Sequence, residues 1–127
     1  MNLLLDTHIF LWYLTADLRL SRRFKTEIEN PINRIHISVV TNWECTVKFA
    51  IGKLLLPQSP AIYFPVARVK HGFESLPIDE LVFPTLANLP LHHRDPFDRM
   101  LVAQAIHHNL LLVTEDPQIR AYAVPML

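Results

Sequence analysis

Five short segments of the chain have the apolar or alternating pattern that predicts β-strands. Residues 3–5 form an apolar run, and residues 34–38 (RIHIS) alternate between polar and β-branched positions. Residues 110–114 (LLLVT) are the most clearly apolar of the five segments. Residues 73–78 (FESLPI) and the final residues 123–127 (AVPML) predict two further short strands.

Helical patterns with recognisable start and stop signals fill the intervals between these strands. Ser21 is a favourable N-cap and Pro31 a stop for a polar helix, Gly52 is a typical helix end, and Asp95 before Pro96 is a typical helix start. The predicted helices cover residues 9–14, 21–30, 40–51, 59–72, 79–88 and 95–109, and a short one follows Asp116.

This alternation of strands and helices indicates the fold class. Strands connected through helices are parallel neighbours with right-handed crossovers. We therefore predict an α/β sandwich with a small, mostly parallel sheet, formed by one domain over residues 1–127. Such folds bind ligands beyond the carboxyl ends of their strands. Asp6 directly follows the first predicted strand, so its carboxylate is expected at that edge.

Two predicted helices carry a carboxylate on a face that is otherwise apolar. Val40, Val47 and Ile51 form one apolar row, and Glu44 occupies the position that completes it. In the helix over residues 95–109, Asp98 lies in the first turn, three residues before the apolar stripe begins. That stripe consists of Leu101, Val102, Ala105 and Ile106.

The fourth carboxylate of interest, Asp116, follows the strand over residues 110–114 much as Asp6 follows the first strand. Each acid also has a local explanation. Asp6 and Asp98 suit helix N-termini, Asp116 before a proline suits a turn, and Glu44 has Lys48 one helical turn away. Acids in four separate segments nevertheless predict a carboxylate cluster at one end of the sheet.

Clustered carboxylates point to a particular cofactor. Like charges held close together repel, and a hard divalent cation removes that cost. Oxygen ligands suit Mg²⁺ or Mn²⁺ better than Zn²⁺. Because Mg²⁺ also binds phosphate oxygens, the cluster predicts phosphoryl-transfer or phosphodiester chemistry.

Composition narrows the class further. The 127 residues suit a single core, and twelve basic and twelve acidic residues leave no net charge to attract nucleic acid or an anionic membrane. The single cysteine, Cys45, excludes an intrachain disulfide and is interpreted as inert. The sequence shows neither a signal-peptide pattern nor a membrane-length apolar run, so we expect a cytoplasmic protein with no membrane partner.

Four motifs together resemble the PIN-domain family. They are LLLDTHIFLW, ISVVTNWECTVKFAIGKL, RDPFDRMLVAQA and LLLVTEDPQI, and they span nearly the whole chain in the expected order. The chain is most similar to the VapC-like toxins of bacterial toxin–antitoxin pairs, in the subgroup with Asp-Thr-His near the N-terminus and an Asp-Pro-Phe-Asp-Arg run. The resemblance implies a three-layer α/β/α sandwich and a Mg²⁺- or Mn²⁺-dependent endoribonuclease.

The resemblance also assigns residues. The four acids of the family, which hold the metal and carry catalysis, map onto Asp6, Glu44, Asp98 and Asp116. The supporting residues are a hydroxyl at Thr7 or Thr114 and a further acid, Asp95, which we interpret first as a helix cap. Thr41 stands where the subgroup often has serine, so a hydroxyl is retained. The implied partners are an RNA substrate, a cognate antitoxin and a second copy of the chain as a homodimer.

Candidate RNA contacts are less specific. Lys48 and Arg99 lie near the predicted acids and are candidates to bind phosphate. The basic cluster of Arg19, Arg22, Arg23 and Lys25 is interpreted as a solvated face. Trp12 and Trp43 lie on apolar stripes and are interpreted as core residues, with stacking on RNA bases as the alternative. The segment LLLPQSPAIYFP (54–65) is a candidate part of a protein interface.

Two alternatives from other classes remain open. A non-catalytic PIN fold would bind RNA or a partner protein without cutting it. A haloacid-dehalogenase-like phosphatase would use an aspartate after the first strand as its nucleophile. That phosphatase site requires a second aspartate two residues after the first, and His8 occupies this position, which disfavours the phosphatase.

Overall fold

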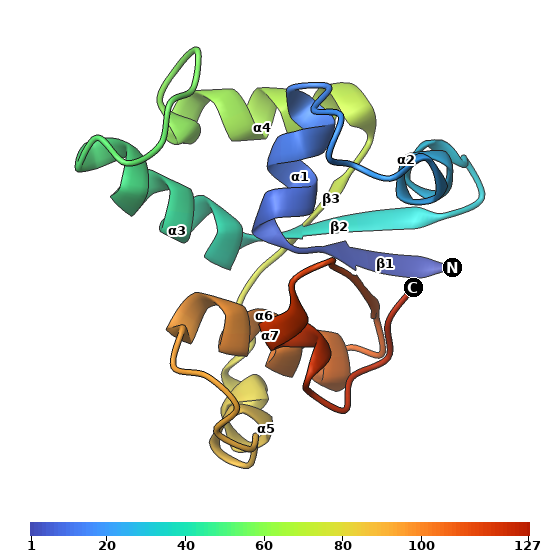
Figure 1. Cartoon of the computed structure of the whole chain (residues 1–127), viewed down its shortest axis with the longest axis vertical. Helices are drawn as coiled ribbons and strands as arrows, with labels where there is room; N and C mark the ends of the chain where they lie inside the picture. The colour runs from blue at the N-terminus through green and yellow to red at the C-terminus, as the bar shows by residue number, and fades with distance from the viewer.

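The chain folds around a small parallel sheet at the centre of the molecule (Figure 1). A computed structural model describes residues 1–127 and places the strands in the order β3-β2-β1-β4, with every neighbouring pair parallel. The strands are β1 (Asn2–Leu5), β2 (Arg34–Ser38), β3 (Glu74–Leu76) and β4 (Leu111–Val113). The predicted α/β class and parallel sheet are confirmed.

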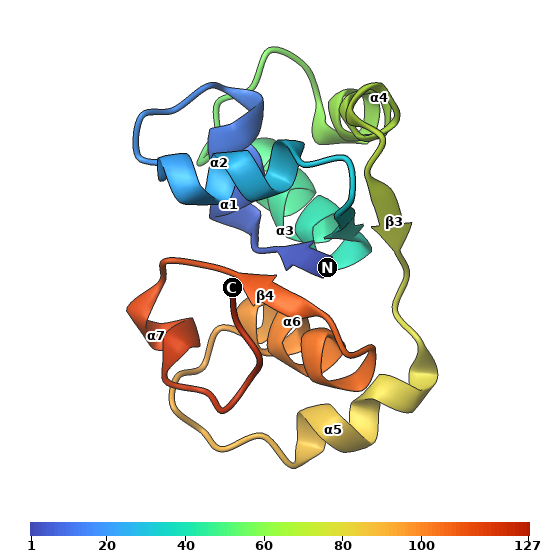
Figure 2. The same cartoon turned by 90° about the vertical axis from the view of Figure 1, so that its right-hand side faces the viewer.

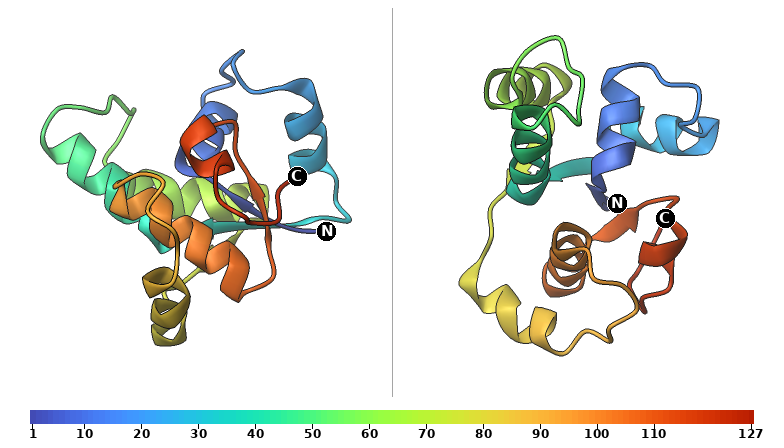
Figure 3. Two further views of the ribbon diagram at one scale, coloured as in Figure 1. Left: turned by 60° about the horizontal axis from the view of Figure 1, so that its bottom comes forward. Right: turned by 60° about the vertical axis from the view of Figure 1, so that its left-hand side comes forward.

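Helices cover both faces of the sheet, which gives three layers (Figures 2 and 3). One side carries α1 (Thr7–Leu14), α2 (Arg22–Glu29), α3 (Val39–Ala50) and α4 (Pro60–His71). The other side carries the 3₁₀ turn η1 (Glu80–Val82), α5 (Phe83–Ala87), α6 (Pro96–His107) and α7 (Pro117–Arg120). None of these helices has the length and apolarity that crossing a membrane requires.

The buried side chains form two clusters, one on each side of the sheet. Leu3 and Leu5 of β1 join the cluster beneath α1, α2 and α4, whereas Leu4 joins the cluster around α6. All three leucines have no solvent exposure, because β1 lies between two other strands and between two helical layers. A central strand buried on both faces is expected to be a continuous apolar run, which is what residues 3–5 show.

Two elements differ from the prediction at the ends of the chain. The first helix starts at Thr7, two residues earlier than predicted, because the Asp6 carboxylate caps it. The predicted last strand over residues 123–127 is wrong: only Leu112 and Met126 form a bridge there. Pro125 has no N–H to donate to a sheet ladder, so this segment pairs with β4 only locally.

The prediction for the apolar row on α3 is wrong in its second half. Val40 and Glu44 are buried, but Val47 is 41% and Ile51 59% exposed. Trp43, predicted to be a core residue, is also 55% exposed and packs edge-on against Phe97. The physical reason is length: α3 continues well past the end of the sheet, where no layer lies opposite its outer face (Figure 1).

Helix α6 is buried more completely than a single apolar stripe predicts. Its residues from Met100 to Ala105 are all buried, including Gln104. The amide of Gln104 is satisfied because its Oε1 accepts from Ser38 at 2.6 Å and its Nε2 donates to the Pro77 carbonyl at 3.2 Å. The helix therefore packs on several sides at once and fixes the position of its first turn firmly.

Candidate functional site

Two acids lie beyond the carboxyl ends of neighbouring strands. Asp6 directly follows β1, and its backbone N–H donates to the carbonyl of Val113, the last residue of β4, at 3.1 Å. Asp116 lies three residues after Val113, the end of β4, and caps α7 by accepting from the Gln118 amide at 2.9 Å. Asp6 and Asp116 line a common surface hollow of about 340 Å³ together with Glu115.

The Asp6 carboxylate is nearly inaccessible, with 2% exposure. One of its oxygens accepts from the Ile9 amide at 2.8 Å, and it also receives a hydrogen bond from Thr114. Burial nevertheless raises the pKa of Asp6, and the negative charge of Asp116 raises it further. The hydrogen bonds from Thr114 and Ile9 and the charge of His8 only partly offset this rise.

Glu44 is a second buried acid, also 2% exposed, and it enters from α3. Thr7 donates to its Oε1 at 2.8 Å, and the Thr7 hydroxyl lies 3.1 Å from the hydroxyl of Thr41. Lys48, one turn along the helix, forms an ion pair with its other oxygen, Oε2. The predicted proximity of Lys48 to this acid is confirmed, and Thr7 directly orients the carboxylate.

Asp98 is the third acid and occupies the first turn of α6. Burial raises its pKa to about 6, and the charges of Asp95, Glu44 and Asp116 contribute in the same direction. The charges of Glu44 and Asp116 thus act on Asp98, as the charge of Asp116 acts on Asp6. Asp95 itself accepts from the amides of Phe97 at 2.9 Å and Asp98 at 3.0 Å, which confirms its predicted role as a helix cap.

His93 is a site residue that sequence reasoning missed. Its Nε2 lies 3.2 Å from Oδ2 of Asp98, and its Nδ1 lies 2.9 Å from the hydroxyl of Tyr122. The side chain of His93 is only 7% exposed. His93 belongs to an irregular loop, and no helical or strand spacing relates a loop residue to the helix that follows it.

Arg99 lies next to Asp98 in the chain but forms no ion pair with any of the four acids. Its guanidinium donates to the carbonyl of Pro90 at 2.8 Å and to the hydroxyl of Tyr122 at 2.9 Å. These contacts tie the loop before α6 to the C-terminal segment.

Cys45 is fully buried, and burial raises the pKa of its thiol to about 12, so it is protonated at neutral pH.

The family model for the PIN domain matches residues 3–125. The chain belongs to the PIN-domain family. No curated protein matches it by sequence.

Solved structures share the fold of this PIN domain over its whole length. A chain in the crystal structure of VapBC2 from Rickettsia felis, bound to a DNA fragment from its promoter, has a TM-score of 0.73 at 16% identity, covering 100% of this chain and 97% of that one. A chain of DNA-bound VapBC from Salmonella typhimurium has a TM-score of 0.65 at 19% identity, covering 99% of this chain and 96% of that one. A chain of FitAcB from Neisseria gonorrhoeae has a TM-score of 0.58 at 20% identity, covering 100% of this chain and 96% of that one.

The acids of this PIN domain suit a hard cation in their chemistry. Four carboxylates come from four elements, and the charged forms of Asp6 and Asp98 are disfavoured by burial and by neighbouring acids. A divalent cation would relieve that cost. As placed, however, no three His, Cys, Asp or Glu side chains are close enough to hold one ion. Glu44 is turned toward Lys48 and Asp98 toward His93, so those contacts must loosen for the acids to converge.

Proposed function

We propose that this protein is a Mg²⁺- or Mn²⁺-dependent endoribonuclease that acts as the toxin of a toxin–antitoxin pair. The observation that carries this proposal is the set of four acids of the PIN domain, because the charges of Glu44 and Asp116, with that of Asp95, raise the pKa of the half-buried Asp98. Burial and neighbouring acids disfavour the charged forms of Asp6 and Asp98, and a bound cation best explains why such acids are present. Phosphodiester hydrolysis is the reaction that such a cation serves in an oxygen-lined site.

The metal would be held by Asp6, Glu44, Asp98 and Asp116, directly or through water. When bound, it supplies an activated water and neutralises charge on the phosphoryl group. The chain's own groups set the geometry. Thr7 holds the Glu44 carboxylate, and the cap at Asp95 fixes the first turn of α6, on which Asp98 lies.

Lys48 and His93 are the groups that would respond to the metal. Each contacts one of the acids, through the Lys48–Glu44 pair and the His93–Asp98 pair. A cation among the carboxylates would compete with both contacts. Lys48 would then be free to bind an RNA phosphate, whereas Arg99 would keep its carbonyl and Tyr122 partners.

We also propose two protein partners. The solved structures with this fold are described as VapBC and FitAB assemblies, which supports a cognate antitoxin for this chain. A homodimer is supported by apolar side chains exposed along the end of α3, the following loop and α4. These exposed side chains are Ile51 at 59%, Leu55 at 93%, Ile62 at 59% and Val66 at 64%.

The deciding experiment compares cleavage of a mixed panel of structured and single-stranded RNAs by the native protein and by Asp6→Asn. Asparagine keeps the oxygen that accepts from the Ile9 amide but removes the charge. We expect cutting in Mg²⁺ or Mn²⁺ by the native protein, none with chelator, and none by Asp6→Asn.

The matched control is Asp79→Asn, which changes another capping aspartate. Asp79 accepts from the Leu81 amide at 2.9 Å and does not line the hollow of Asp6 and Asp116. It should cut like the native protein. Cleavage that persists in Asp6→Asn would overturn the assignment of this acid. Metal-independent RNA binding without any cleavage would favour the non-catalytic PIN module, and a trapped aspartyl phosphate on Asp6 would favour the phosphatase.

A further inference from the structure

Two neighbouring hollows on the surface share one wall. The first is the hollow of about 340 Å³ that contains Asp6 and Asp116. The second, of about 370 Å³, lies between α1, α3 and the loop after α3. His8, Trp12 and Arg19 line both hollows, and we refer to these three residues as the shared wall.

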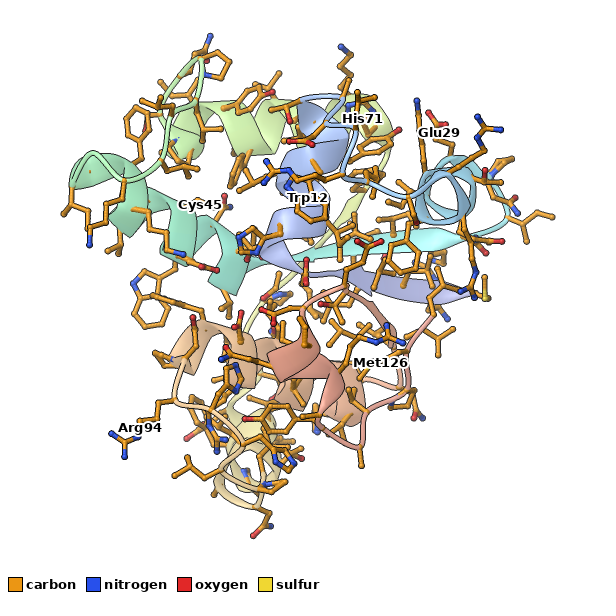
Figure 4. All side chains as sticks on the ribbon, viewed as in Figure 1. Trp12, Glu29, Cys45, His71, Arg94 and Met126 are labelled. Carbon is orange, nitrogen blue, oxygen red and sulfur yellow. The ribbon has the colours of Figure 1, made fainter.

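The side chains of Arg19 and His8 both lie against the ring of Trp12. The guanidinium carbon of Arg19 lies 5.1 Å from the centre of the Trp12 ring, a cation–π distance. The His8 ring lies one helical turn before Trp12, with its centre 6.1 Å from the Trp12 ring and tilted by 53°. Trp12 is half-buried on α1 and stands near the middle of the face seen in Figure 4.

Arg19 is held in a fixed orientation although 70% of its side chain is exposed. Its Nε donates to Oδ1 of Asp17 at 3.1 Å, and its Nη2 donates to Oδ2 at 2.7 Å. The hydrogen bonds from Arg19 lower the pKa of Asp17 to about 2, so the pair stays charged at neutral pH. The exposed guanidinium thus lies over the indole ring and keeps donors for a further partner.

The two hollows differ in charge on either side of this wall. Asp6, Glu115 and Asp116 line the first. Lys48 and Lys53 line the second together with Asp17 and Glu44, and Lys48 is paired with Glu44. An RNA strand that places one phosphate beside the acids would therefore find Lys53, which forms no ion pair, for its next phosphate across the wall. The nucleotide between the two phosphates would lie against Trp12 and Arg19.

We propose that His8, Trp12 and Arg19 form a stacking wall that receives an unpaired nucleobase of single-stranded RNA next to the acidic site. This inference rests on the proposed function in taking RNA as the ligand. Unstacked bases bind aromatic rings and arginine planes, and every base offers such a face, so the wall selects for single strands without selecting a base. The protein has no net charge and therefore no bulk electrostatic attraction for RNA, so stacking would supply binding energy that does not depend on charge.

The first test reads stacking directly through tryptophan fluorescence. The chain has two tryptophans, so Trp43→Phe leaves Trp12 as the only indole. Titration with poly(U) in chelator should quench Trp12, and a poly(A)·poly(U) duplex should not. An unchanged Trp12 signal with poly(U), or equal quenching by the duplex, would overturn the proposal.

The second test measures affinity for a fluorescently labelled oligouridylate in chelator by anisotropy. Trp12→Leu should weaken binding about 5- to 150-fold, the range for loss of one base–aromatic stack, whereas Trp12→Phe should bind close to the native level. Arg19→Ala should also weaken binding. Its charge control is Arg23→Ala, which changes an exposed arginine outside both hollows and should bind like the native protein. Melting temperatures check that all variants are folded.

The outcomes separate this inference from the proposed function. Quenching without cleavage in Mg²⁺ or Mn²⁺ supports the stacking wall and overturns the nuclease. Cleavage by a protein whose Trp12 is not quenched overturns the wall and keeps the nuclease. Equal affinity of Trp12→Leu and Trp12→Phe shows that the hollow needs only an apolar side chain, as a protein segment would, and also overturns the wall.

Discussion

At the scale of single residues, each acid of the site is tolerated by different neighbours. The Asp6 carboxylate accepts hydrogen bonds from the Ile9 amide and from Thr114. The Glu44 carboxylate accepts a hydrogen bond from Thr7 and forms an ion pair with Lys48. The Asp98 carboxylate contacts the ring of His93. The charge of Asp98 is only partly compensated, since burial and three neighbouring acids raise its pKa to about 6. Its charge is therefore a direct source of instability in the metal-free protein.

We predict that Asp98→Asn stabilises the metal-free protein at high pH. In the folded state the pKa is raised from 3.8 to about 6, so the native protein binds more protons than the unfolded chain between these values. The free energy of unfolding should therefore fall as pH rises through this window. Because the group is partly open to solvent, we expect a gain of about 1 kcal/mol in Asp98→Asn at pH 8.

The measurement is urea unfolding of both proteins in chelator at several pH values. The advantage of Asp98→Asn should disappear below pH 3.8, where both states of the native protein are protonated. A constant difference at all pH values would show that the effect comes from packing and contradict the electrostatic explanation.

A second prediction concerns the hydroxyl of Thr7. Thr7→Val keeps the shape but removes the donor to Glu44 Oε1, so a buried carboxylate oxygen loses a partner. We expect a loss of about 1–3 kcal/mol in the free energy of unfolding. Cleavage of RNA should fall as well, because Glu44 loses its orientation. Thr7→Ser keeps the hydroxyl and should retain both; equal loss in the two variants would refute the hydrogen-bond explanation.

At the scale of elements, three helices start at the acidic edge of the sheet. Asp6 caps α1, Asp95 caps α6 and Asp116 caps α7. A capping aspartate satisfies the free amides of the first turn, and the helix N-terminus in turn favours its negative charge. Asp6 and Asp116 thus serve the fold and the site together, which explains how each suits both the local and the functional interpretation.

Asp95 provides a way to separate these two duties. Its oxygen accepts from the amides of Phe97 and Asp98, so Asp95→Ala should cost about 1 kcal/mol of stability. Asp95→Ser restores a cap without a charge and should recover stability together with RNA cleavage. Thermal unfolding and a cleavage assay on the three proteins make the comparison. Restored stability without restored cleavage would show that the Asp95 charge belongs to the site.

At the scale of the whole molecule, α3 and α4 extend beyond the sheet and expose apolar side chains on their outer surface. Val66 and Val69 of α4 are 64% and 71% exposed. We predict a homodimer through this surface, and Val66→Lys should shift the protein to a monomer with little change in monomer stability. Light scattering after size-exclusion chromatography measures this shift. Arg23→Ala is the control, and a native protein that is monomeric at every concentration would exclude the dimer.

A metal bound among the acids should stabilise the whole fold. At a Mg²⁺ or Mn²⁺ concentration 100 times the Kd, linkage adds about 2.7 kcal/mol to the free energy of unfolding. The melting temperature of the native protein should rise with metal, and that of Asp98→Asn should rise much less. Calorimetry in metal and in chelator measures both, and equal increases in the two proteins would place the ion elsewhere.

The sequence by itself determined the parallel α/β class, the buried strand β1, the caps at Asp6 and Asp95, and the four acids as candidates. These features depend on local pattern: apolar runs, capping chemistry and carboxylates at unusual positions. The sequence did not determine every element boundary, since α1 starts two residues earlier than predicted. The expected strand over residues 123–127 does not form, because Pro125 cannot continue a sheet ladder.

The tertiary structure decided which residues meet across elements. The contact of His93 with Asp98 and the position of Arg19 over Trp12 depend on loop paths that no periodicity encodes. The exposure of Trp43 depends on where the layers end, since an apolar position is buried only when another element lies opposite it. Caps and apolar runs depend on residues close together in the sequence, whereas contacts between distant segments depend on the packing of the whole fold.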